Sequence, residues 1–112
     1  MEFSKEQIEE LKQISPNLSQ SEEGGYTYFL LENYPLPEGC QPERADLLLC
    51  PMPKNGYTSI LYFSVTPTGC IQRNWNGNVH VLGRNWFSYS WQTHAGHSLI
   101  QMLQIHLNAL KR

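Results

Sequence analysis

The chain has 112 residues, of which 40% are hydrophobic and 12% are aromatic, as is usual for folded globular proteins. This length is enough for one hydrophobic core and too short for two, so we expect a single domain over residues 1–112. The formal net charge of −2, with few and scattered basic residues, gives no electrostatic reason to expect binding to nucleic acid or to a membrane surface.

The first residues are polar and acidic, and no cationic segment leads into an apolar one, so we expect no signal peptide. No apolar run approaches the roughly 20 residues needed to cross a bilayer. The three cysteines, Cys40, Cys50 and Cys70, are widely spaced and form no Cys-x-x-Cys pair, which argues against a zinc site or a redox pair. We therefore expect a cytoplasmic protein with reduced thiols, no metal and no cofactor.

The first predicted element is a helix that follows Ser4 and ends at the Ser-Pro pair of residues 15–16. Ser4 is a plausible N-cap, and Gln7 at the third helical position completes a capping-box pattern. The apolar side of this helix consists of Ile8, Leu11 and Ile14. The polar residues 17–25, which end in two glycines, are predicted to form a loop.

Strands are predicted over residues 26–31, 45–50 and 58–65, with a short fourth strand over 79–82. The proline-rich residues 34–42 do not suit a central strand and are expected to form an extended connection. Asn55 and Gly56 predict a turn before the third strand. That strand has apolar residues on both sides, so it is expected to be central.

The last predicted element is a helix over residues 98–110, in which Ser98 and Gln101 repeat the capping-box pattern. Its apolar stripe consists of Leu99, Leu103, Leu107 and Leu110. This order of elements predicts an α+β domain. An antiparallel meander of three or four strands would be covered on one face by helices from both ends of the chain.

Residues 66–81 are the most informative segment. We expect an irregular loop that hangs open beside the sheet and turns at the Asn-Gly pair of residues 76–77. The segment contains one thiol, Cys70, one imidazole, His80, and several asparagines including Asn76. Because reactive groups are often presented on loops between ordered elements, this loop is the candidate functional site.

The order of elements and several motifs resemble ubiquitin-conjugating enzymes. Thr66 and Pro67 match the Thr-Pro that ends the third strand in that family, and Asn76 with Gly77 matches its Asn-Gly turn. The position of the family's catalytic cysteine, three residues after that glycine, holds His80. The histidine of the family's His-Pro-Asn tripeptide falls on Cys70, and no such tripeptide is present.

A more specific resemblance is to the divergent prokaryotic branch of that superfamily, which is found beside bacterial genes for ubiquitin-like proteins. It rests on Tyr-Pro-Leu-Pro-x-Gly at residues 34–39, Asp-Leu-Leu-Leu at 46–49 and Gly-Arg-x-Trp at 83–86. The similarity covers roughly residues 26–110. It implies a UBC-like fold and a role in conjugating a ubiquitin-like protein.

The family mechanism would have an activating enzyme load the carboxyl terminus of the ubiquitin-like protein onto Cys70, from which an amine would displace it. His80 would act as general base, and Asn76 would donate to the developing oxyanion. Ser88 or Ser90 could carry an oxyester in place of the thioester. Each residue also has a plain interpretation: an inert loop thiol, a surface histidine and a turn-forming asparagine.

Tyr34, Arg84, Trp86 and Trp91 are the candidate contacts for the ubiquitin-like protein or the activating enzyme, because tryptophan and arginine dominate interface energetics. The two tryptophans could instead pack between the sheet and the last helix. Two functions remain open: a conjugating transferase, and a non-catalytic variant of the same fold that binds one of these partners. An unrelated small α+β binding domain is a third interpretation.

Overall fold

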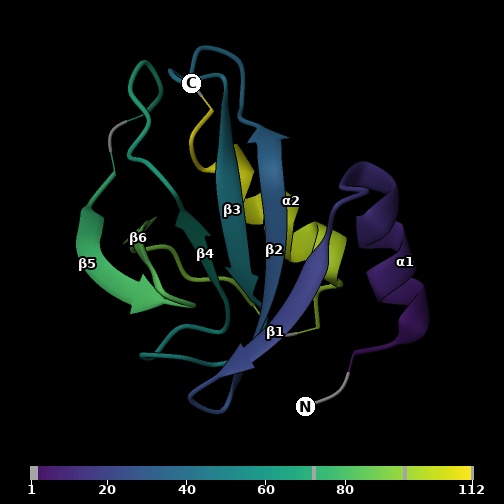
Figure 1. Cartoon of the computed structure of the whole chain (residues 1–112). Helices are drawn as coiled ribbons and strands as arrows, with labels where there is room; N and C mark the ends of the chain where they lie inside the picture. Colours follow the sequence, from purple (N-terminus) through teal and green to yellow (C-terminus); the bar gives the residue numbers. More distant parts are fainter. Residues whose placement is uncertain (1–2, 72, 95, 112) are drawn as a thin grey trace.

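The computed structural model describes residues 3–71, 73–94 and 96–111, which contain two helices and six strands (Figure 1). The elements in chain order are α1 (Lys5–Ile14), β1 (Ser19–Glu23), β2 (Tyr26–Pro35), β3 (Arg44–Cys50), β4 (Ile60–Phe63), β5 (Trp75–Val81), β6 (Arg84–Tyr89) and α2 (Leu99–Asn108). The α+β class and the antiparallel sheet are confirmed. Within the described residues, neither helix is long and apolar enough to cross a bilayer.

The strands form one antiparallel sheet with the order β1-β2-β3-β4-β6-β5. β2, β3 and β4 correspond to the three predicted strands of the meander, and the predicted short strand over 79–82 falls largely within β5. The β5–β6 hairpin is added so that β6 lies beside β4 and β5 becomes the edge strand. In the part of the chain that the structure describes, one pair, Phe63↔Phe87, joins β4 to β6, which is fewer than for any other two neighbouring strands.

The prediction of a loop over residues 17–25 was wrong, because Ser19–Glu23 forms β1 and pairs with β2 along its full length. Four of its five residues are exposed. Its polar sequence therefore shows none of the alternation by which a half-buried strand is recognised. β1 is an edge strand, and main-chain hydrogen bonds to β2 define it.

The Asn-Gly pair at residues 76–77 does not form the predicted turn. It lies inside β5, where a bulge shifts the register between Asn76 and Val79. The turn to β6 occurs instead at Leu82 and Gly83, both with positive φ (53° and 76°). The turn predicted at residues 55–56 is confirmed, with Asn55 and Gly56 at φ values of 53° and 86°.

One face of the sheet is covered by both helices, as predicted (Figure 1). The four leucines of the predicted α2 stripe and Leu11 of α1 are buried in this helix-facing cluster. The capping box of Ser98 and Gln101 is complete. At α1, Ser4 accepts from the Gln7 N–H, but the Gln7 side chain accepts instead from the Leu99 N–H at 3.2 Å, which links the starts of the two helices.

The opposite face carries a second cluster, centred on Tyr28, Leu48, Tyr62 and Trp86. The two edges of the sheet approach each other around it. The carboxylate of Glu23, next to the β1–β2 turn, accepts from the N–H of Leu82 in the β5–β6 turn, at 3.2 and 3.3 Å. The sheet is therefore curled around the second cluster, which has no helix over it.

Lys54 covers part of the second cluster with its ammonium group. Its Nζ lies 4.9, 5.0 and 5.2 Å from the ring centroids of Tyr26, Tyr28 and Tyr62, and donates to the Tyr28 hydroxyl at 2.6 Å. Burial raises the pKa of Tyr28 to about 12, so its hydroxyl stays neutral. These cation–π contacts hold the turn before β4, which carries Lys54, against the tyrosines of β2.

We predict that Lys54→Met, which keeps the length of the side chain, lowers the free energy of unfolding by about 1 kcal/mol. The loss arises because the cation–π contacts and the hydrogen bond to Tyr28 disappear together. Urea denaturation would measure it. Lys12→Met is the matched control, because Lys12 makes only an exposed pair with Glu9 and should change stability by less than about 0.5 kcal/mol. Equal effects of the two substitutions would contradict the prediction.

Candidate functional site

The segment of residues 66–81 is not the open loop that we predicted. Pro67 and Cys70 are buried, and the segment from Trp75 onward is strand β5. Thr68 pairs with Gln41 through two main-chain hydrogen bonds of 2.8 and 2.9 Å. The expectation failed because this segment contacts distant parts of the chain. Its apolar residues pack in the helix-facing cluster, and its main chain pairs with the loop between β2 and β3.

Cys70 lies in the helix-facing cluster with 4% of its surface exposed, and its thiol points to the Pro67 carbonyl at 3.9 Å. The neighbouring thiol of Cys40 has its pKa raised to about 12, first by burial and then by the nearby Cys70 thiol. A thioester carrier requires a thiolate that an acyl group can reach. This site is apolar and covered, so Cys70 is not presented to a partner.

His80 lies away from Cys70. β5 begins at the end of the molecule near the C-terminus and runs away from it (Figure 1), and the Ile71 N–H bonds to the Leu110 carbonyl at 3.2 Å. His80 is five residues farther along β5 than Trp75, roughly 16 Å at the rise of a strand. Its Nδ1 is 3.0 Å from Oδ1 of Asn85, and its ring is exposed. The structure therefore does not bring the predicted nucleophile and base together.

Asn76 faces a different feature, a cavity of about 210 Å³ where β4 and β6 diverge beyond their single pair. Asn76, Ser88, Ser90 and Trp91 contribute to its wall. Ser88 is buried and Ser90 is exposed. The described residues lining this cavity are hydroxyl-bearing, carboxamide or apolar and include no charged side chain, so it suits a neutral polar group.

A buried polar network that the sequence analysis missed lies beside this cavity. Ser59 Oγ is 2.7 Å from Thr93 Oγ1 and 2.9 Å from His106 Nε2. The three residues are almost fully buried. Tyr89 adds a hydrogen bond from its hydroxyl to the His106 carbonyl. Because Ser59 is covered, this serine–histidine contact holds α2 against the sheet and does not provide an accessible nucleophile.

Burial lowers the pKa of His106 to about 4, below its ordinary value near 6.5, so the folded chain keeps this imidazole neutral. The unfolded chain takes up a proton as pH falls below 6.5, whereas the folded chain does not until about pH 4. We predict that His106 alone reduces the free energy of unfolding by about 3 kcal/mol between pH 7 and pH 4.

Chemical denaturation of the wild type and of His106→Gln at several pH values would check this prediction. The glutamine variant does not titrate, so the stability difference between the two proteins should shrink as pH falls through this window. A difference that stays constant from pH 7 to pH 4 would show that His106 has the same pKa in the folded and unfolded states.

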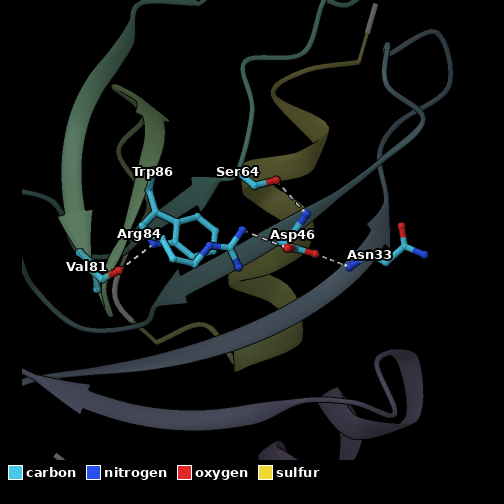
Figure 2. A network of polar contacts seen from close by, with 6 residues as sticks. All are labelled: Asn33, Asp46, Ser64, Val81, Arg84 and Trp86. Carbon is cyan, nitrogen blue, oxygen red and sulfur yellow. Dashed lines mark hydrogen bonds and ion pairs between the residues drawn. The ribbon is translucent and has the colours of Figure 1, made fainter.

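Arg84, a predicted partner contact, is engaged within the chain (Figure 2). Its guanidinium lies 4.5 Å from the ring centroid of Trp86 and donates to Oδ2 of Asp46 at 3.0 Å. Trp86 is fully buried in the second cluster and donates from its indole N–H to the Val81 carbonyl at 3.0 Å. The prediction that Trp86 contacts a partner was therefore wrong. The alternative, that it packs between the sheet and the last helix, was also wrong, because it lies in the cluster on the opposite face.

Asp46 is the centre of this network (Figure 2). Its Oδ1 accepts from the Asn33 N–H at 2.8 Å, and its own N–H donates to Ser64 Oγ at 3.1 Å. Asn33 has a positive φ of 49° and lies where the β2–β3 register shifts. One carboxylate therefore supports the β2 irregularity and orients Arg84, whose side chain stays partly exposed.

Trp91 is half-buried against the helix-facing cluster, under a second arginine. The Arg73 guanidinium lies 4.6 Å from its ring centroid and donates from Nε to the Ala109 carbonyl at 2.8 Å. Arg73 therefore ties the segment before β5 to the C-terminal end of α2, where a cation also complements the helix dipole. Trp91 remains partly exposed.

Tyr34 is half-buried at the end of β2, and burial raises the pKa of its hydroxyl. Residues 34–42 are not the extended connection that we predicted. Tyr34 and Pro35 end strand β2, and the residues after them turn back toward β3. A hollow of about 300 Å³ lies between this segment and α2. It is lined by Tyr34, Pro35, Leu36, Pro37, Gln104, Leu107, Asn108 and Lys111.

Comparison with known proteins gives no match: no protein family, no curated protein and no solved structure is significantly similar to the chain. The resemblance to ubiquitin-conjugating enzymes therefore stays a prediction from motifs. No cluster of three or more His, Cys, Asp or Glu side chains suited to a metal ion occurs within residues 3–71, 73–94 and 96–111.

Proposed function

We propose that this chain is a non-catalytic relative of ubiquitin-conjugating enzymes that binds a ubiquitin-like protein in a bacterial conjugation pathway. The motif resemblance supports the pathway. The burial of Cys70 supports binding over thioester transfer, because the one thiol in the expected catalytic segment is covered. A cytoplasmic location, where such pathways operate, is part of the proposal.

The hollow beside Tyr34 is the proposed contact surface. It combines an aromatic ring, two prolines, the side of α2 that carries Gln104 and Asn108, and Lys111 beyond the end of that helix. Prolines are already restricted in φ, so this segment would lose little backbone entropy when a partner binds to it. Tyrosine supplies a large, rigid contact area.

The first test combines the chain with the ubiquitin-like protein and the activating enzyme encoded in its gene neighbourhood, with ATP. We predict no covalent adduct and reversible binding of the ubiquitin-like protein, measured by calorimetry. Tyr34→Ala should weaken this binding by about tenfold, as expected for an aromatic interface residue. Gln20→Ala, an exposed change on β1 away from the hollow, is the matched control and should leave the affinity unchanged.

An adduct that thiol reductant removes, and that Cys70→Ser abolishes, would overturn the binding proposal and support the thioester transferase. The absence of both adduct and binding would exclude both functions.

A second candidate function is an oxyester carrier, favoured by the cavity between β4 and β6. Ser90 is exposed at its wall, which also includes Asn76, whose side chain could donate to an oxyanion. This function requires an adduct that resists reductant, is cleaved by hydroxide and disappears in Ser90→Ala. Ser88→Ala is the matched variant, because Ser88 lines the same cavity but is buried.

A further inference from the structure

Two segments that lie far apart in the sequence run side by side in antiparallel directions. Gln41 and Thr68 exchange two main-chain hydrogen bonds of 2.8 and 2.9 Å. Next to them, Gly39 and Gly69 are in direct backbone contact, since a Cβ on Gly69 would lie 2.3 Å from the Gly39 carbonyl oxygen. Any side chain at residue 69 would separate the two segments. The backbones are therefore held close together where Cys40 and Cys70 are attached.

Cys40 and Cys70 point into the same part of the molecule. They are 1% and 4% exposed, and both belong to the helix-facing cluster. The pKa of the Cys40 thiol is raised first by burial and then by Cys70, so the two thiols are neighbours in this cluster. The third cysteine, Cys50, lies in the cluster on the opposite face of the sheet, where its thiol points to the Met52 carbonyl at 3.8 Å. The fold therefore pairs two of the three thiols and keeps the third apart.

We propose that Cys40 and Cys70 are a redox-sensitive pair that forms an intramolecular disulfide when the chain meets a small peroxide. One thiol loses its proton, and its sulfur attacks a peroxide oxygen. The O–O bond breaks, hydroxide leaves and a sulfenic acid forms. The second thiol then attacks that sulfur, the S–S bond forms and water leaves. Two thiols are oxidised by two electrons in total, and one hydrogen peroxide is reduced to two waters.

The cross-link would join the loop between β2 and β3 to the segment that leads into β5. Both thiols are buried in apolar surroundings, which disfavour the thiolate. The attack on the peroxide therefore requires a brief opening of these loops, and we expect it to be slow. The second step needs only the small adjustment that joins two neighbouring side chains. The pair does not depend on the proposed binding function.

The test treats the folded, full-length chain with hydrogen peroxide and maps disulfides by mass spectrometry of unreduced peptides. We expect a cross-linked peptide containing Cys40 and Cys70, reversed by dithiothreitol, at least about tenfold more abundant than either pairing with Cys50. The same treatment in urea should give mixed pairings. The oxidised chain should melt at least about 5 °C above the reduced chain, because the bond closes a long loop in the unfolded state.

Cys50→Ala is the matched variant, because it removes a buried thiol and leaves the pair intact, so it should form the same cross-link. Cys40→Ala and Cys70→Ala should each abolish it. Peroxide treatment of the folded wild type that yields only sulfinic acids, unchanged thiols or the pairing mixture seen in urea would overturn the proposal. These outcomes do not involve the ubiquitin-like protein, so they are separate from the test of the binding function.

Discussion

The burial of the α2 leucine stripe against one face of the sheet is the interaction on which the rest of the structure depends. Three leucines of α2 and Leu110 just after it lose most of their contact with water there, which is a large part of the apolar burial available to a chain of this size. Other groups on that face depend on the position of α2. His106 is made neutral by this burial, and Arg73 and Ile71 bond to the carbonyls at the end of the helix.

The same packing decides the chemistry of Cys70. The segment before β5 passes beside the C-terminal end of α2, where its apolar side chains join the helix-facing cluster. A thiol in that position contributes to the core and is shielded from an acyl donor. The structure therefore separates the features that the motif resemblance groups together: Cys70 in the core, His80 at the far end of β5, and Asn76 on the cavity between β4 and β6.

On the opposite face no helix is found among the described residues, and the sheet curls over its own second cluster. The contact between Glu23 and the Leu82 N–H joins the two hairpin turns, while Lys54 caps the tyrosines of the second cluster. Trp86 fills this cluster, which explains why the tryptophan that looked like an interface residue in the sequence is fully buried. A buried indole beside an arginine has the same sequence pattern as an exposed one, and only the curvature of the sheet distinguishes them.

The sequence by itself determined the features that depend on neighbouring residues. The two helices, the capping box of Ser98 and Gln101, the leucine stripe and the turn at residues 55–56 follow from local periodicity and backbone preference, and all are present. The α+β class followed from the order of these elements. The tertiary structure alone decided that the polar residues 19–23 form a strand, that Asn76 and Gly77 lie at a bulge, and that Cys40 and Cys70 lie in the same buried cluster. Each of these depends on a partner that lies elsewhere in the chain, and local sequence preferences contain no information about which distant segment will supply it.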